Sequence, residues 1–348
     1  MDTVRMDSLA GRTADTPFKV AVIGAGSWGS AVAWLLGTKG IQVALWSRNQ
    51  DLVRDINDTH HNPRYLSDLV LPETVIAHSD LSLAVDGVKA VVLVTPSLAL
   101  AEMGTQLKPL IADDLPLMIL SKGLDPESGG LLDETLTSIV GHPERIAVLS
   151  GPNHAEEVSR GVPSATVVAS VNDACALFFQ ELMATPTFRV YVSSDTIGVQ
   201  LCGAAKNIVA IACGLAAGIG LGDNTQATIM TRGLAEIARL VEAAGGDQIT
   251  CMGLAGMGDL IATCTSEHSR NRSFGMELAH GGSLEDYQAR THMIVEGALA
   301  ARTVLTIAAR YGVEMPICER VRSIVWDGQS IDQAAQALIN RDFKPEFY

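Results

Sequence analysis

The sequence predicts an α/β domain with a doubly wound sheet, followed by an all-α domain. Up to about residue 195, short continuous apolar runs alternate with helical segments, as strands buried in a parallel sheet do. Beyond that point, long stretches rich in Ala, Leu, Gly and Ile have helical spacing and contain no strand-like run. We therefore expect a flexible tail at residues 1–16, the α/β domain at 17–196 and the helical domain at 197–342.

Composition favours a large folded core and argues against nucleic acid as a partner. Hydrophobic residues make up 47% of the 348 residues and charged residues 18%, which suits two domains with buried interiors. The 25 basic side chains face 39 acidic ones, and no basic stripe is present. The six cysteines form no CxxC pair and the histidines have no metal-binding spacing, so we expect buried thiols and no metal.

Two features of the chain bear on its location. The N-terminal segment MDTVRMDSLAGRTADTP has no apolar centre of the kind that a signal peptide needs. The longest apolar stretch, Ile208 to Leu221, is shorter than the roughly 20 residues that span a bilayer. We expect a cytoplasmic protein without a membrane span.

The first strand leads into a glycine-rich turn. The run FKVAVI ends at Ile23, GAGSWG follows, and then come an apolar helix ending at Gly40 and a second run, VALWS. In this βαβ unit Gly24 permits the tight turn, Gly26 lets a pyrophosphate approach the backbone, and Gly29 permits close packing. The pattern predicts a Rossmann-type sheet that binds a dinucleotide at a helix N-terminus; a purely structural turn is the alternative.

Further strands are predicted at Ala90–Val94, Leu117–Leu120, Ile146–Leu149, Ala165–Ala169 and Phe188–Val192. The first three are followed by the loops TPS, SKG and SGPN, and ligands bind at the carboxyl ends of such strands.

The end of the second strand bears on cofactor choice. An NAD site usually has Asp or Glu there for the ribose 2′-hydroxyl, but this chain has Ser47-Arg48-Asn49. Arg48 can pair with a 2′-phosphate, which favours NADP(H), with NAD(H) also accepted. A surface arginine without that role is the alternative.

Two lysines stand in unusual settings. Lys122, in the SKG loop, can meet a substrate carbonyl or phosphate, or can be an ordinary loop lysine. Lys206 is the only charged residue between Asp195 and Asp223. A buried ammonium is costly, and enzymes use such lysines as proton donors near neutral pH; the alternative is a lysine whose head reaches the surface.

Polar residues follow in two other places. Asn153, after the strand IAVL, can cap the next helix or offer its amide to a substrate. The stretch GLAGMGDLIATCTSEHSRNRSFG joins Asp259, able to orient Lys206, to the donors Ser269, Arg270 and Asn271. Arginine and asparagine donors suit a phosphate monoester. The alternative is a solvent-exposed charged patch that binds no ligand.

From Lys19 to about Gly328 the sequence resembles the bacterial NAD(P)-dependent glycerol-3-phosphate dehydrogenase family. The resemblance rests on VIGAGSWGSAVA, SKGL, SGPNHAEEV, LCGAAKNIVAIACG, GLAGMGDL, TCTS with SRNRSFG, and IVEG, in that order. It implies reversible reduction of dihydroxyacetone phosphate to sn-glycerol 3-phosphate, which supplies the glycerophospholipid backbone, and a homodimer. Family members often have Ser or Thr where this chain has Asn153, and valine where it has Ile294.

The resemblance also implies roles for individual residues. Lys206 is the general acid/base and also binds substrate. The implied cofactor contacts are Gly24, Gly26, Ser27, Trp28, Gly29, Arg48, Tyr65, Lys122, Ala155, Arg270, Ile294 and Glu296. The implied substrate contacts are Lys122, Gly151, Asn153, Asp259, Ser269, Arg270 and Asn271.

Two other functions remain open on the residues alone. One is a reductase of another small acid, such as a β-hydroxyacid or ketopantoate, although the SRNR donors favour a phosphate over a carboxylate. The other is a regulator that senses NADP without catalysis, which would have no need of an isolated lysine in an apolar helix.

Overall fold

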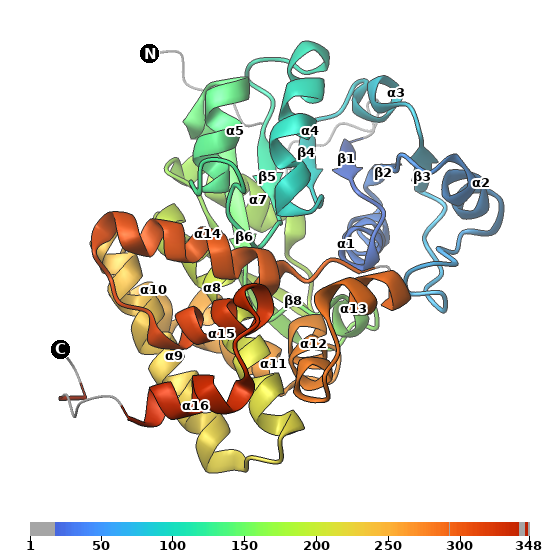
Figure 1. Cartoon of the computed structure of the whole chain (residues 1–348). Helices are drawn as coiled ribbons and strands as arrows, with labels where there is room; N and C mark the ends of the chain where they lie inside the picture. The colour runs from blue at the N-terminus through green and yellow to red at the C-terminus, as the bar shows by residue number, and fades with distance from the viewer. Residues whose placement is uncertain (1–17, 292, 341–344, 347–348) are drawn as a thin grey trace.

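The computed structural model describes residues 18–291, 293–340 and 345–346, so the predicted tail at 1–16 lies outside the described residues. This part of the chain forms an eight-stranded sheet with helices on both faces and a helical region beside it (Figure 1). The strands are β1 Lys19–Ile23, β2 Gln42–Trp46, β3 Val75–His78, β4 Ala90–Leu93, β5 Leu117–Ile119, β6 Ile146–Ser150, β7 Ser164–Ala169 and β8 Phe188–Ser193.

The order of the strands is β3-β2-β1-β4-β5-β6-β7-β8. β1 pairs in parallel with β2 on one side and with β4 on the other, so the winding reverses at the carboxyl end of β1. Such a switch point is where open α/β sheets bind ligands. The doubly wound fold predicted from the sequence is confirmed.

Helices cover both faces of the sheet. These helices are α1 Ser27–Thr38, α2 Gln50–Thr59, α3 Leu81–Val85, α4 Leu100–Leu107, α5 Leu132–Val140, α6 Ala155–Val158 and α7 Asp173–Met183. One apolar cluster joins α1, α2 and α7 to one face, and another joins α4 and α5 to the opposite face. Central strands are therefore apolar along their whole length, which is why the sequence shows continuous apolar runs there.

The structure differs from the predicted sheet in one strand, β3, which the sequence analysis did not predict. Only Val75 and Ala77 of its four residues are buried, because β3 is an edge strand with one partner. Its apolar run, Val75 to Ala77, is only three residues long and is followed by polar residues.

β7 runs antiparallel to β6, which the sequence analysis did not specify. The four-residue helix α6 is the helix between β6 and β7. Residues 151–163 connect the two strands, and a parallel return across the sheet is usually made by a helix longer than α6. The connection therefore reverses the chain without crossing the sheet.

The helical region follows β8. It comprises α8 Thr196–Gly218, α9 Asp223–Ala243, α10 Gln248–Met252, the π-helical turn η5 Leu254–Gly258, α11 Asp259–Thr265, α12 Arg270–Ala279, α13 Leu284–Thr291, α14 Glu296–Tyr311, α15 Pro316–Asp327 and α16 Ile331–Ile339. All six cysteines are buried and free, most of them in the core of this region.

α8 is the central helix of this region, and its length corrects the sequence-based expectation. The predicted apolar stretch was too short for a bilayer, whereas the helix has 23 residues and meets the length and composition of a membrane span. Its most apolar window is 83% buried inside the protein, as expected of a core helix. The difference arises because the helix begins at Thr196, where Asp195 caps it by accepting a 2.8 Å hydrogen bond from Gly198 N.

Glycines bring α8 and α12 into close contact. A Cβ on Gly214 would lie 2.1 Å from the carbonyl oxygen of Arg272, and one on Gly275 would lie 2.2 Å from that of Ile211. Neither helix could approach so closely with any other residue at these positions. The contact sets the first turn of α12 beside α8.

Candidate functional site

The glycine turn lies between β1 and α1, at the switch point of the sheet. Gly24 has φ +119°, and a Cβ there would lie 2.7 Å from Val94 O. A Cβ on Gly29 would lie 1.7 Å from Gly24 O, so this glycine permits the turn to pack on the helix. Nothing lies within 4 Å of a Cβ built on Gly26, which leaves its backbone open to an approaching phosphate at the start of α1.

Other residues around this turn fit a dinucleotide. Ser27 and Trp28 form the first turn of α1, and the buried indole Nε1 of Trp28 has no hydrogen-bond partner among the described residues. Thr95, which follows β4, has a buried hydroxyl that likewise lacks a partner in the described protein. An open turn with two unsatisfied donors close to the carboxyl ends of β1 and β4 is the arrangement a nucleotide can complete.

Two further predicted cofactor contacts, Arg48 and Tyr65, lie outside the glycine turn. Arg48 follows β2 and is exposed. Tyr65 lies in a turn that is tied to the glycine loop by Asn62, a buried residue that the sequence analysis missed. The Asn62 amide donates to Ala25 O at 2.9 Å and its oxygen accepts from Tyr65 N at 3.1 Å.

Lys206 is buried, with 5% of its surface exposed, so it does not extend to the surface. Its Nζ donates to Oδ1 of Asp259 at 2.6 Å and to the hydroxyl of Thr263 at 2.6 Å. The Thr263 hydroxyl in turn donates to the backbone oxygen of Asp259, so it meets Lys206 with a lone pair. Among the described residues no third acceptor takes the remaining N–H of Lys206.

Lys122 has its three N–H groups committed. Its Nζ donates to Oδ2 of Asp259 at 2.8 Å, to Gly151 O at 2.8 Å and to Oδ1 of Asn153 at 2.6 Å. Asp259 therefore bridges the two lysines, one through each carboxylate oxygen. Two cations sharing one buried anion leave the cluster with a net positive charge.

Burial and charge act in opposite directions on this cluster. Burial, with help from Lys206 and against the attraction of Asp259, lowers the pKa of Lys122 to about 8. Burial alone would raise the pKa of Asp259, but the two ammonium groups outweigh it and hold that pKa below its usual value. Asp259 is thus an ionised carboxylate at neutral pH.

Asn153 does not cap the following helix, so that alternative is wrong. The residue before α6 is His154, and no side chain caps the helix. Gly151 has φ +152°, and a Cβ there would lie 2.8 Å from the Cα of Thr166, so the loop cannot shift toward β7. Ala155 is the first residue of α6 and is buried.

The predicted phosphate-binding residues begin α12. Ser269 is its N-cap, and its hydroxyl accepts from Arg272 N at 3.2 Å. Arg270 is exposed at the first position of the helix. The buried Asn271 donates to Oδ1 of Asn207 at 2.9 Å and accepts from Gly297 N at 2.9 Å, which ties α12 to α8 and α14. An arginine over a helix N-terminus favours an anion there.

Ile294 precedes α14 and Glu296 begins it. The carboxylate of Glu296 accepts from the backbone N–H of Ser97 at 3.3 Å and from its hydroxyl at 2.7 Å. Burial raises the pKa of Glu296, and the hydrogen bonds from Ser97 oppose that shift. These contacts join the helical region to the loop after β4, on the side of the sheet where the glycine turn lies. Ile294 is half-buried.

The sequence analysis missed several residues of this cluster. Thr263 and Asn207 lie within the motifs TCTS and LCGAAKNIVAIACG but were given no role, and Ser97 lies in the TPS loop. Helical spacing could have identified Thr263, which lies four residues after Asp259 on the same face. Asn207 and Ser97 carry no comparable local signal.

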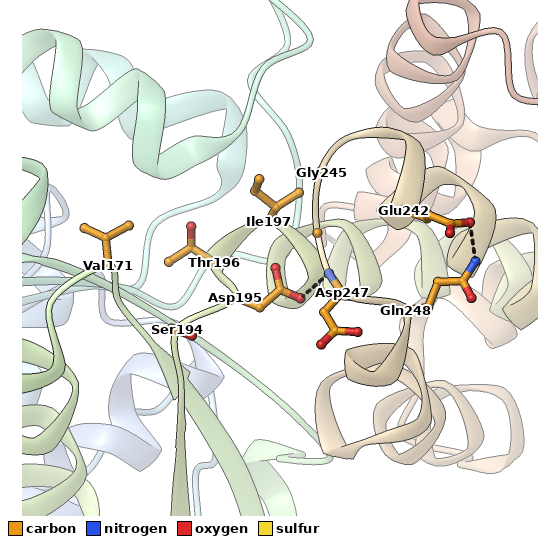
Figure 2. A pocket seen from close by; sticks show the side chains of 10 residues that line it. Val171, Ser194, Asp195, Thr196, Ile197, Glu242, Gly245, Asp247 and Gln248 are labelled. Atoms are coloured by element: carbon orange, nitrogen blue, oxygen red, sulfur yellow. Dashed lines mark hydrogen bonds between the residues drawn. The ribbon is translucent and has the colours of Figure 1, made fainter.

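A cleft of about 650 Å³ lies between the start of the helical region and the loop after β7, away from the lysine cluster (Figure 2). It is lined by the start of α8 and by the loop between α9 and α10, and none of the predicted site residues lines it. Its central carboxylate, Asp195, accepts hydrogen bonds from Asp247 N and the Thr250 hydroxyl. These hydrogen bonds of Asp195 join the start of α8 to α10.

A glycine turn lies at the switch point of a doubly wound sheet, and a buried Lys–Asp–Lys cluster is formed by the loop after β5 together with α8 and α11. This arrangement defines a nicotinamide-dependent oxidoreductase. The chain belongs to the NAD-dependent glycerol-3-phosphate dehydrogenase family. Residues 19–176 match the model of the family's N-terminus and residues 195–336 match that of its C-terminus.

Individual relatives agree with this assignment. The glycerol-3-phosphate dehydrogenase (NAD(P)+) of Corynebacterium jeikeium is 43% identical over 330 residues, covering 94% of this chain and 99% of that protein. That of Moorella thermoacetica is 44% identical over 322 residues, covering 92% and 96%. The crystal structure of glycerol-3-phosphate dehydrogenase from Coxiella burnetii has a TM-score of 0.90 at 40% identity, covering 93% of this chain and 99% of that one.

A ketopantoate reductase family protein from Ralstonia eutropha is also similar, with a TM-score of 0.59 at 18% identity. That likeness extends over 88% of this chain and 97% of that one, and it shows a shared fold alone.

Proposed function

We propose that this chain catalyses the reversible, NAD(P)H-dependent reduction of dihydroxyacetone phosphate to sn-glycerol 3-phosphate. The observation that carries the proposal is the buried Lys206–Asp259–Lys122 cluster, formed by α8, α11 and the loop after β5. Family membership supports the substrate, and the residues around the cluster supply the groups that this reaction requires. The nicotinamide, when bound, supplies the hydride that adds to the ketone carbon.

Lys206 is the general acid in this proposal. Reduction of a ketone needs a proton on its oxygen, and Lys206 retains an N–H that neither Asp259 nor Thr263 accepts. The proton passes from Nζ to the substrate oxygen, and in the reverse direction Nζ receives it. Asp259 and Thr263 fix the ammonium in place, so little reorganisation is needed when the substrate arrives.

Lys122 acts through charge and position. With its N–H groups held by Asp259, Gly151 and Asn153, it adds a positive charge beside the developing alkoxide. The predicted contacts of Lys122, Gly151, Asn153 and Asp259 with the substrate belong to this proposal.

The phosphate of the substrate is proposed to lie at the start of α12. Arg270 supplies a planar guanidinium from the first position of the ten-residue helix, whose N-terminal end favours an anion. Asn271 keeps one amide proton beyond its bond to Asn207. Ser269 contributes through the cap that it forms, which holds this turn in shape.

We propose that NADP(H) is preferred and that NAD(H) is accepted. Arg48 is exposed at the end of β2, where a 2′-phosphate of the cofactor would lie, and no carboxylate stands in its place. Arg48→Ala should raise the KM for NADPH about tenfold and leave that for NADH nearly unchanged. A wild-type KM for NADPH well above that for NADH would contradict the preference.

The proposed function is tested by following NADPH oxidation by its absorbance with dihydroxyacetone phosphate, with unphosphorylated dihydroxyacetone and with a panel of keto acids. Turnover should need the phosphorylated ketone. Equal use of dihydroxyacetone would contradict the phosphate site, and preference for a keto acid would favour a reductase of another small acid. Binding of NADPH without turnover of any substrate would favour a regulator.

The remaining sequence-based expectations stand as parts of this proposal. They are a domain boundary between residues 196 and 197, a homodimer, a cytoplasmic location, a catalytic site without a metal, and supply of the glycerophospholipid backbone. Cofactor contacts by Ser27, Trp28, Tyr65, Ala155, Ile294 and Glu296 are proposed in the same way.

A further inference from the structure

We propose that Asn153 is a positioning residue that binds the ammonium group of Lys122 and thereby assigns different tasks to the two lysines of the cluster. The inference rests on the proposed function, which it deepens. Resemblance to the family implies only that residue 153 contacts the substrate. In this chain its side-chain oxygen lies 2.6 Å from Nζ of Lys122.

The orientation of the Asn153 amide follows from its neighbours. Its oxygen faces an ammonium, which can only donate, and its nitrogen lies 3.4 Å from the hydroxyl oxygen of Thr166. That hydroxyl donates its own proton to Ser150 O at 2.9 Å, so it offers Asn153 a lone pair. A reversed amide would set its NH₂ group against the ammonium. Asn153 is 8% exposed and its orientation is therefore set by protein groups.

Asn153 supplies the third of three acceptors. Asp259 accepts one proton of Lys122 from α11, Gly151 accepts another through its backbone, and Asn153 accepts the last. Three acceptors for three protons leave Lys122 no free donor before the substrate binds. Lys206 has two acceptors and keeps one proton free, so it is the lysine that can deliver a proton.

The residue type at position 153 matters because the length of its side chain decides whether it can contact Lys122. The amide oxygen of asparagine lies two bonds beyond Cβ, whereas the hydroxyl of the Ser or Thr common in the family lies one bond beyond it. The loop cannot move to compensate, because Gly151 is held against Thr166. A shorter side chain at position 153 would leave one N–H of Lys122 available to the substrate.

Three titratable groups face or surround Lys122: Asp259 on α11, Lys206 on α8 and His154 at the start of α6. Burial lowers the pKa of His154, so this imidazole is neutral at the pH values that matter here. Asp259 remains ionised, since the lysines hold its pKa down. Burial lowers the pKa of Lys122 to about 8, so the titration must be followed at this residue itself.

Two substitutions that keep nearly the shape of the Asn153 side chain should shift the pKa of Lys122 in opposite directions. Asn153→Leu removes the acceptor, so the protonated form of Lys122 loses a hydrogen bond and its pKa should fall by about one unit. Asn153→Asp adds a negative charge at the same place, so the pKa should rise by about one unit or more. If turnover requires protonated Lys122, the alkaline limb of kcat/KM should move in the same two directions.

The titration is measured in two ways. The first is the pH profile of kcat/KM for dihydroxyacetone phosphate. The second is the rate at which trace acetic anhydride acetylates Lys122 as a function of pH, read by mass spectrometry, which needs no turnover. The exposed Asn224→Ser variant is the matched control and should leave both titrations unchanged. Circular dichroism and NADPH binding establish that each variant is folded.

The expected result is a labelling midpoint for Lys122 that falls in Asn153→Leu and rises in Asn153→Asp. An unchanged midpoint in folded Asn153→Leu, or a shift of both variants in one direction, would overturn the role of Asn153. Absence of turnover by the wild type would refute the proposed function instead. The labelling experiment would still decide whether Asn153 binds Lys122.

Discussion

Replacement of Asp259 by asparagine tests the cluster most directly, because one carboxylate serves both buried lysines. Its Oδ1 lies 2.6 Å from Lys206 and its Oδ2 lies 2.8 Å from Lys122, and its side chain is 3% exposed. The substitution Asp259→Asn keeps the shape of the side chain and removes its charge. An amide has a single oxygen, so one of the two ammonium groups would face an NH₂ group.

The size of the effect follows from these contacts. Removal of one partner from a buried ion pair costs about 3–5 kcal/mol of unfolding free energy. An opposite charge in direct contact changes a pKa by about 1–3 units, so the pKa of Lys122 should fall from about 8 to about 5–7. Lys122 would then be largely neutral at pH 7.5, and kcat should fall by about 10²-fold or more.

Urea unfolding at pH 7 and pH 10, followed by circular dichroism, measures the penalty. The difference in unfolding free energy between wild type and variant should be smaller at pH 10 than at pH 7 by about 1 kcal/mol. The reason is that native Lys122 releases its proton at a lower pH in the variant than in the wild type. Asp58→Asn, which replaces an exposed carboxylate, is the matched control and should change little. A stability and kcat within twofold of the wild type at pH 7 would refute the idea that Asp259 balances both lysines.

Three further predictions concern single residues. Lys206→Ala should lower kcat by about 10²–10⁴-fold while the Kd for NADPH, measured by fluorescence, stays nearly constant; preserved turnover would reject its role. Arg270→Ala should chiefly raise the KM for dihydroxyacetone phosphate, by about tenfold or more, and an unchanged KM would remove Arg270 from the phosphate site. Burial raises the pKa of Glu236 from its usual 4.5 to about 7, so native protein holds a proton that unfolded chain has lost. Stability should therefore fall by about 3 kcal/mol between pH 4.5 and 7, and Glu236→Gln should abolish that slope in urea unfolding.

The predicted fold agrees with the structure where burial is uniform along an element. β1 and β4 are buried on both faces, so their sequences are continuous apolar runs that local analysis detects. β3 has one neighbour and alternating exposure, and the apolar run in its sequence, VIAH, is only three residues long. The antiparallel pairing of β7 goes with a connection whose only helix, α6, has four residues, and local apolar patterns do not report the direction of a strand.

The site was predictable to the extent that each motif carries its own chemistry. The glycine turn, the isolated Lys206 and the donors at residues 269–271 were identified from residue types and their local context. Their partners were less accessible: Lys122 lies 137 positions from Asp259 in the chain, and Asn207 lies 64 positions from Asn271. No local pattern predicts which of two lysines has all its protons accepted.

The amino-acid sequence by itself determined the succession of strands and helices that predicts a doubly wound sheet, the glycine turn and the identity of the polar groups, because apolar runs, turn residues and residue types are recognised within short segments of the chain. Tertiary structure decided how those groups pair: which ammonium shares which carboxylate oxygen, that Asn153 binds Lys122, and that α12 lies against α8. The physical reason is that a buried charge must find its partners in space, and those partners come from distant segments that meet only when the core has formed.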